Sequence, residues 1–191
     1  MLTPCTPVII KARARTSIRG RGQVESEERV MIAPEEGRSI SLGGLGVIHK
    51  FSAQDTGGSF SIVEHPLQPG TLAAPPHTHL NEDEYSYVLE GEVGVQIGER
   101  EFTALPGAYI LKPRGVPHTF WNAGVVPARI IEIISPAGFE KYFDEIGEVI
   151  SEAASGEPDV AKIMEIAGRY GLSMQMERIP ELVEKYNLRL G

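Results

Sequence analysis

Short runs of alternating apolar and polar residues dominate the chain between Ser39 and Ile134. Segments rich in Gly, Pro, Asp and Asn separate these runs. Because side chains of a strand point alternately to its two faces, this period of two predicts half-buried β-strands. The predicted strands span residues 39–51, 59–67, 85–97, 101–105, 108–112, 118–121 and 128–134. Many short strands with regular turns favour a sandwich or a barrel, whose closure also protects the strand edges.

The apolar period lengthens after Pro136. Apolar residues then recur three, four and seven positions apart, at Phe139, Tyr142, Phe143, Ile146, Val149 and Ile150. This spacing predicts an amphipathic helix, and ordinary core packing is the simplest interpretation of its apolar stripe. A second helix is predicted over residues 158–170 and a third over 180–186. The chain is therefore expected to consist of a loose extension (1–30), a β-barrel (31–136) and a helical tail (137–191).

Residues 1–30 show no sustained hydrophobic period, so we expect them to contribute little to the fold. Three interpretations remain open: an Arg-rich transit peptide, an extension that packs on a partner subunit, or an upstream start that precedes the true start at Met31.

Composition and charge narrow the classes of partner. The length of 191 residues suits one domain, and the single cysteine, Cys5, offers no disulfide pair. No apolar run approaches the roughly 18 residues that a membrane span needs, and no signal peptide is recognisable, so we expect a cytoplasmic protein. Residues 1–29 carry six basic and three acidic residues, so their net charge is +3. Since the whole chain has a net charge of −8, the remaining residues have a net charge of −11. Because residues 30–191 are this acidic, they should repel nucleic acids and anionic membranes. A small molecule is therefore the expected partner.

Three histidines and one glutamate carry the candidate chemistry. His77 and His79 alternate along a predicted strand, so both imidazoles point to the same face. The turn that follows allows Glu84 to return a carboxylate to that face, and His118 opens a later strand. Imidazole and carboxylate ligands suit one divalent transition metal ion, and Fe, Mn, Ni, Co, Cu and Zn are not distinguished by this set. Four protein ligands leave two positions of an octahedral ion open to a ligand.

The same residues match both motifs of the cupin superfamily. The first motif, G-x5,6-HxH-x3,4-E-x6-G, runs from Gly70 to Gly91, and the second, G-x5-PxG-x2-H-x3-N, runs from Gly107 to Asn122. The resemblance covers residues 39–136 and implies a mainly β double-stranded β-helix, or jelly-roll barrel, with C-terminal α-helices. It also implies that the ion is held by His77, His79, Glu84 and His118. Because only Glu84 has the six-residue spacing to Gly91, its neighbours Glu82 and Asp83 are expected to face solvent.

The helical tail after the segment SPAGFE is similar to that of bacterial single-domain cupins related to quercetin 2,3-dioxygenase. This resemblance implies a metal-dependent dioxygenase, in which Glu84 acts both as a ligand and as a catalytic proton acceptor.

Strand alternation predicts which side chains accompany the ion. Counting from Glu84 places Ser86 and Val88 on the metal side, and counting from His118 places Phe120 there, so these three are the candidate substrate-binding residues. With no Lys or Arg expected to point inward and bind a phosphate, a small aromatic or enolisable substrate is favoured. An isomerase or lyase that uses the ion as a Lewis acid, and a binding protein without turnover, remain as alternatives.

The remaining polar and aromatic positions are interpreted structurally. His49 and His65 lie outside both motifs and are expected to be structural, while Glu132 is expected to be exposed or ion-paired. The same alternation directs four residues to the outer face of the barrel: Tyr85, Tyr87, Thr119 and Trp121. Outward aromatic rings need a cover, which the tail, the N-terminal region or a second subunit would supply, and a homodimer is expected.

Overall fold

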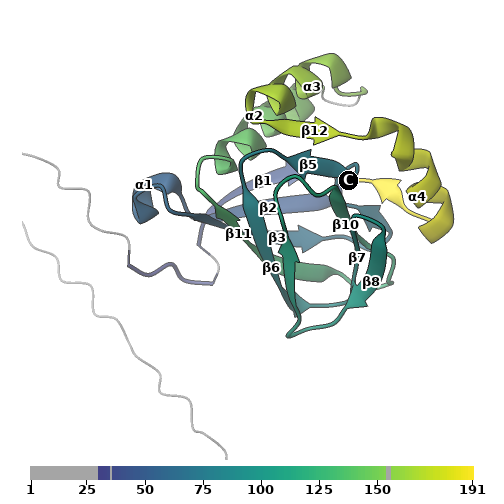
Figure 1. The fold of residues 1–191 in the computed structure, drawn as a ribbon, viewed down its shortest axis with the longest axis horizontal. Coiled ribbons are helices and arrows are strands. Elements are labelled where there is room, and N and C mark those ends of the chain that lie inside the picture. Colours follow the sequence, from purple (N-terminus) through teal and green to yellow (C-terminus); the bar gives the residue numbers. More distant parts are fainter. Residues whose placement is uncertain (1–29, 35, 154–155) are drawn as a thin grey trace, which may run out of the picture.

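The computed structural model describes residues 30–34, 36–153 and 156–191 of the chain. Strands come first and helices last, as predicted, and the mainly β jelly-roll class with C-terminal α-helices is confirmed. Figure 1 shows the sheets curving into a barrel, with α2 and α3 above one end and α4 beside it. Apart from residue 30, the predicted N-terminal extension lies outside the described residues. The division at residues 31–136 and 137–191 stays a prediction.

The first sheet has six strands in the order β1-β2-β3-β11-β6-β9, all paired antiparallel. Its strands are β1 (Arg38–Leu42), β2 (Leu45–Phe51), β3 (Ser61–Leu67), β6 (Asp83–Glu90), β9 (Tyr109–Lys112) and β11 (Ala128–Ser135). Buried and half-buried residues alternate strictly along β3 and β11. This alternation is the half-buried pattern from which the strands were predicted, because one face of the sheet meets the core.

The second sheet follows the order β12-β5-β10-β4-β13, and β7 joins it through β10 and also pairs with β8. Its strands are β4 (Thr71–Leu72), β5 (His77–His79), β7 (Val93–Ile97), β8 (Arg100–Ala104), β10 (His118–Asn122), β12 (Leu172–Met174) and β13 (Arg189–Leu190). The tail strand β12 pairs antiparallel with β5, and β13 pairs parallel with β4. These two tail strands were not predicted, because two or three residues are too short to display a period.

The three predicted tail helices are present as α2 (Glu140–Glu152), α3 (Val160–Arg169) and α4 (Ile179–Tyr186). Two short helices were not predicted: α1 (Ala53–Thr56) after β2, and the 3-10 helix η1 (Met176–Arg178) before α4. The Asp159 carboxylate accepts a hydrogen bond from the Lys162 amide at 3.0 Å and so caps the start of α3. None of the helices described here has the length and apolar character needed to cross a bilayer.

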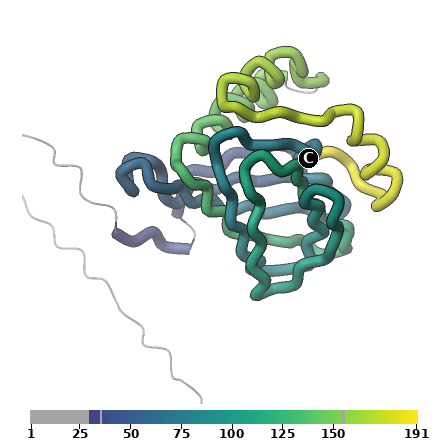
Figure 2. The backbone as a smooth tube through the Cα atoms, in the orientation of Figure 1, coloured from purple at the N-terminus to yellow at the C-terminus, as the bar shows by residue number. Residues whose placement is uncertain are grey.

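Barrel and tail share one hydrophobic core. The stripe on α2 is buried at Phe139, Tyr142, Phe143, Ile146 and Val149, in the same cluster as the inward residues of both sheets. The tube in Figure 2 shows the tail following β11 back across the end of the barrel. The apolar stripe predicted from its spacing therefore closes the barrel.

A smaller cluster covers one of the aromatic rings that were expected to face outward. Trp121 is buried against Leu182 of α4 and stacks on Tyr186 with ring centroids 4.5 Å apart. Gly94 makes room for this ring, because a Cβ there would lie only 2.1 Å from the indole nitrogen. The tail thus supplies the cover for Trp121, as one of the alternatives foresaw.

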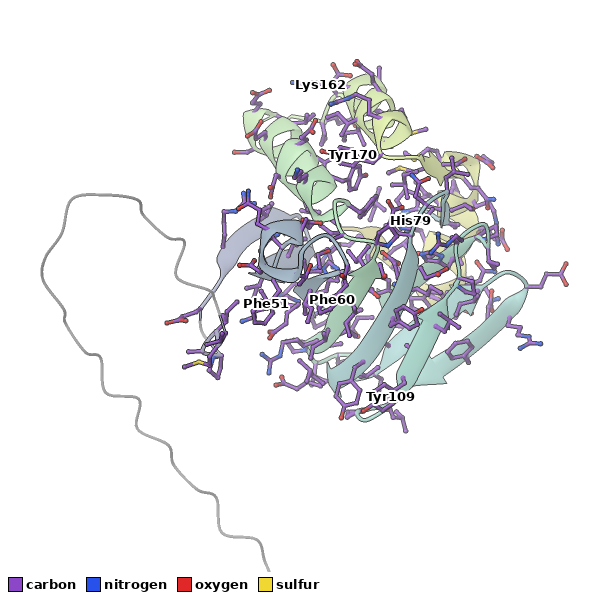
Figure 3. The ribbon with its side chains drawn as sticks, turned by 60° about the vertical axis from the view of Figure 1, so that its left-hand side comes forward. Phe51, Phe60, His79, Tyr109, Lys162 and Tyr170 are labelled. Atoms are coloured by element: carbon purple, nitrogen blue, oxygen red, sulfur yellow. The ribbon has the colours of Figure 1, made fainter. Side chains whose placement is uncertain are left out.

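Other outer aromatics remain at the surface. Tyr85 is 44% exposed and Tyr109 is 83% exposed, while Thr119 is buried and donates a hydrogen bond to the Ala74 carbonyl at 2.7 Å. Figure 3 shows Tyr109 at the end of the barrel opposite the helices. The homodimer expected from such outward rings stays a prediction.

Replacement of Leu182 by alanine tests the attachment of α4. The side chain is fully buried in the small cluster, so L182A should lower the free energy of unfolding by about 2–5 kcal/mol. Urea denaturation measures this loss. As a matched control, the 93% exposed Val125 should tolerate V125A within about 0.5 kcal/mol. Equal effects of both changes would contradict the packing of α4 on Trp121.

Candidate metal centre

The four predicted ligands lie together inside the barrel. His77, His79, Glu84 and His118 are all buried, and one ligand atom from each lies within 4.8 Å of the others. The two histidines of β5 share a face, as their alternation predicted, and His118 of β10 lies directly opposite His77 in the ladder. Glu84 reaches the same point from β6, on the other sheet.

A glycine turn fixes the approach of His118. Gly115 adopts a φ of 74°, a left-handed conformation that a glycine enters without strain. Its amide donates a hydrogen bond to the His79 carbonyl at 2.8 Å. The loop before His118 is therefore fastened to the strand that carries the other two imidazoles.

Backbone carbonyls orient two of the rings. Nδ1 of His77 lies 2.8 Å from the Pro75 carbonyl oxygen, and Nδ1 of His118 lies 3.1 Å from that of Val116. Because a carbonyl only accepts hydrogen bonds, Nδ1 carries the proton in both rings and the Nε2 lone pair is free. Burial lowers the pKa of His118 and holds the pKa of His77 well below its ordinary value, so both rings stay neutral.

The facing ligand atoms are arranged so that a cation could lie between them. Nε2 of His118 lies 3.0 Å from Oε2 of Glu84, and Nε2 of His79 lies 3.3 Å from Oε1. A lone pair and a carboxylate oxygen are both acceptors, and burial disfavours the proton that would join them. A divalent ion satisfies all of these atoms at once, so the residues present fit a metal ion.

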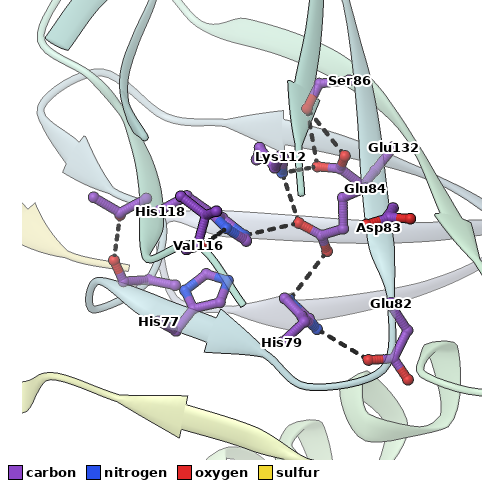
Figure 4. Close-up of polar contacts among 12 residues, drawn as sticks. His77, His79, Glu82, Asp83, Glu84, Ser86, Lys112, Val116, His118 and Glu132 are labelled. Atoms are coloured by element: carbon purple, nitrogen blue, oxygen red, sulfur yellow. Dashed lines mark hydrogen bonds and ion pairs between the residues drawn. The ribbon is translucent and has the colours of Figure 1, made fainter. Parts of the chain in front are cut away.

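Behind Glu84 lies a row of buried polar side chains (Figure 4). Nζ of Lys112 is 2.9 Å from Oε2 of Glu84 and 2.5 Å from Oε2 of Glu132, and the Ser86 hydroxyl donates to Glu132 at 3.0 Å. Burial alone would raise the pKa of Glu84, but the neighbouring Lys112 ammonium holds it well below its usual range. Burial would likewise lower the pKa of Lys112, yet the two carboxylates raise it.

Glu132 is the second carboxylate of this row. Burial raises the pKa of Glu132 to about 7, against the opposing pull of Lys112. One ammonium is shared by two carboxylates. Glu84, whose pKa is lowered, is therefore more fully ionised than Glu132, whose pKa is raised.

Two expectations about charged residues are wrong. A lysine does point inward, because Lys112 is fully buried between Glu84 and Glu132. Glu82 does not face solvent: it is buried, and its Oε2 lies 3.5 Å from Nδ1 of His79. The turn folds Glu82 back over the ring, a direction that strand alternation does not predict for a turn residue.

Other predicted positions agree with the structure. Asp83 lies near the surface, where it pairs with Arg114 at 2.8 Å. Glu132 is ion-paired, which was one of its two expected states.

An apolar cavity of about 230 Å³ is lined by three of the four candidate ligands, His77, His79 and Glu84. Tail residues provide much of its wall: Phe139, Tyr142, Phe143, Ile146, Ile150, Pro158, Val160, Ile163, Leu172, Met174 and Met176. Among the predicted substrate contacts, Phe120 lines the cavity. Ser86 is held by Glu132, and Val88 is buried in the core; neither is among the described lining residues. Both side chains are buried, as alternation predicted, but Ser86 is bound to Glu132, which also pairs with Lys112 from the neighbouring strand.

His65 is a lining residue that sequence reasoning treated as merely structural. It is buried on β3, its Nδ1 lies 3.0 Å from the Gly46 carbonyl oxygen, and its ring contacts Phe143 edge-on at 5.5 Å. Burial lowers its pKa to about 4. Its alternation with Val63 on an inward face was the available signal. His49, in contrast, pairs with Asp144 of α2 at 3.0 Å, outside the cavity.

The depressed pKa of His65 predicts a pH-dependent stability. The unfolded chain binds a proton near pH 6.5 and the folded chain only near pH 4, so this stabilisation is complete above pH 6.5 and is lost as the pH falls towards 4. Compared with H65N, which does not titrate, the wild type should lose about 3 kcal/mol over this window. Urea denaturation in the presence of a chelator measures the difference. A pH-independent difference between the two proteins would contradict the assignment.

Comparisons with known proteins find similarity in the part of the chain that carries this geometry. The model described as "Cupin domain" matches residues 63–134. The curated HTH-type transcriptional regulator PuuR of Escherichia coli is 29% identical over 104 residues, which cover 52% of this chain and 54% of the regulator. This chain therefore spans about half the length of the curated relatives it matches.

Two solved structures are similar to part of this chain. KdgF from Halomonas sp. superposes with a TM-score of 0.50 at 17% identity, covering 57% of this chain and 94% of that one. A cupin-superfamily sugar phosphate isomerase from Silicibacter pomeroyi gives a TM-score of 0.44 at 24% identity, covering 48% and 59% of the two chains. The stretch that matches the cupin-domain model, residues 63–134, carries all four candidate ligands.

Proposed function

We propose that this chain is a metal-dependent dioxygenase that acts on a small aromatic or enolisable substrate. The observation that carries the proposal is the cluster of three imidazoles and one carboxylate, of which His77, His79 and Glu84 line the wall of an apolar cavity. A ligand bound in that cavity touches the ion site and the tail together. The cavity volume of about 230 Å³ limits the substrate to a small molecule.

His77, His79, Glu84 and His118 would hold the ion. A bound transition ion supplies Lewis acidity and, where it is redox-active, electron exchange with dioxygen. Glu84 is the proposed catalytic group, because its carboxylate stays ionised inside the barrel and so can accept a proton from an enolisable or phenolic substrate. Its Oε1 atom is the better acceptor, since Oε2 already receives the Lys112 ammonium.

The tail and Phe120 are proposed to bind and enclose the apolar part of the substrate. Phe120 of β10 lines the cavity together with Phe139 and Phe143 of the tail. These rings exclude water from the site, which protects reactive species from hydrolysis. Substrate contacts by Ser86 and Val88 stay a prediction.

The charges of the cavity argue against a phosphate-bearing substrate. Lys112 is the inward cation of the site, and both of its close partners are carboxylates. A phosphate group would need donors that are not already committed to buried acids. An isomerase or lyase acting on an uncharged enolisable substrate remains compatible with the same residues.

A binding role without turnover is the second candidate. The observation that favours it is the similarity to the PuuR regulator, which spans about half of each chain. In that role the cavity would bind an effector, and the metal site would orient it.

Metal content tests the first step of the proposal. We expect one divalent transition ion per chain, and H77A or H118A should abolish most of the occupancy measured by elemental analysis. The ion should also raise thermal stability, by about 2.7 kcal/mol at 100 times Kd, and should bind more weakly as pH falls, because only neutral imidazole can ligate. H49A, which alters a histidine outside the cluster, is the control and should keep the ion. Full occupancy in both H77A and H118A would refute the ligand assignment.

Oxygen uptake tests the reaction class. Protein loaded in turn with iron, manganese, nickel and cobalt should consume oxygen with some member of a panel of phenolic and enolisable compounds. E84Q should lose this activity because an amide is a weaker metal ligand than a carboxylate and cannot accept the proton, whereas V125A, altered at an exposed site, should keep it. Substrate conversion without oxygen uptake would instead support the isomerase or lyase, and binding without conversion would support the effector role.

A further inference from the structure

Lys112 and Glu84 are built into the barrel as direct cross-strand partners. They face each other in the ladder between β9 and β6, and Glu132 faces Ser86 in the ladder between β11 and β6. Three adjacent strands thus place the four polar side chains in a row by register alone. The contact between ammonium and ligand carboxylate needs no ion to form.

We propose that Lys112 is a positioning residue that serves as a permanent counter-charge for Glu84 and lowers the affinity of the site for its metal ion. The inference rests on the proposed metal-binding role. Lys112 contacts Oε2 of Glu84 at 2.9 Å, the same oxygen that lies 3.0 Å from Nε2 of His118. An ion that binds between Glu84 and His118 must therefore share this oxygen with an ammonium.

Charge explains both halves of the proposal. Without the ion, Lys112 compensates a carboxylate that would otherwise be buried and unpaired, so the ligand set keeps its geometry. With the ion, two cations lie close together inside a barrel of low polarity and repel each other. The site is thereby preorganised but holds the ion less tightly than the same four ligands would alone.

Glu132 and Ser86 hold Lys112 in this place. Nζ is 2.5 Å from Oε2 of Glu132, whose Oε1 and Oε2 accept from the Ser86 hydroxyl at 3.0 and 3.2 Å. The ammonium also lies 5.1 Å from the centroid of the Phe120 ring, a favourable distance for a cation over an aromatic face. Because these contacts tie down the lysine, it cannot swing away when the ion binds.

Another buried lysine provides a matched control. Lys50 on β2 pairs with Glu64 at 3.5 Å and donates to the Pro34 and Glu36 carbonyls, with none of the four candidate ligands among its contacts. K50M and K112M therefore both remove a buried ammonium from a carboxylate partner. They differ in whether that partner is a metal ligand.

The decisive measurement is metal affinity, obtained by competition with a chromophoric chelator. K112M should bind the ion roughly ten-fold more tightly than the wild type, because the repelling ammonium is gone. Its metal-free form should melt at a lower temperature. The cobalt(II) absorption spectrum should also change, since Glu84 is free to offer its second oxygen. K50M should lose stability but keep the wild-type affinity and spectrum.

K112M leaves the buried Glu132 carboxylate without its lysine partner, which disfavours folding. The double variant K112M/E132Q also removes the charge of Glu132 and so provides a second test. It too should bind the ion more tightly than the wild type. Unchanged or weaker affinity in K112M, or in the double variant where K112M does not fold, would overturn the inference. A wild type that binds no ion would instead refute the proposed function itself.

Discussion

The negative charge of Glu84 inside the barrel is the constraint on which the rest of the site depends. A buried carboxylate is costly unless cations or donors surround it, and here Lys112 and the histidines of β5 and β10 converge on its two oxygens. An imidazole that acts as a metal ligand supplies a lone pair and no charge, so it does not balance the charge of the carboxylate. The Lys112 ammonium balances part of this negative charge, and a metal ion bound at the proposed site would balance the rest.

The candidate metal site lies where the barrel and the tail meet, and the tail packs directly against the ligand histidines. Strand β12 pairs with β5 in a register that sets Leu172 beside His79 and Met174 beside His77. Phe139, at the start of α2, packs edge-on against the His79 ring at 4.4 Å. Water is thus excluded from the ligand side by residues that are distant in sequence. Tail and metal site form a single packed unit, and loss of the tail would expose the ligands.

The strands, the helices and the ligand set were predictable because each rests on a short-range pattern. Alternation placed His77 and His79 on one face, and the stripe on α2 predicted a helix that covers apolar surface. Lys112 was missed because its partner depends on which strands become neighbours, and single-strand alternation does not contain that information. Had β9 been assigned next to β6 in register, Lys112 would have been found opposite Glu84.

The balance of buried charge bears on what the cavity accepts. Lys112 and Glu132 offset one another, and Glu84 offsets one of the two charges of a divalent ion. One positive charge then remains beside an apolar wall, where water is scarce and charge is poorly screened. A neutral molecule that loses one proton on binding would carry one negative charge and cancel this positive charge. A multiply charged anion would leave the site with an excess of negative charge. Phenols and enolisable carbonyl compounds meet this requirement and also suit the apolar wall around Phe120.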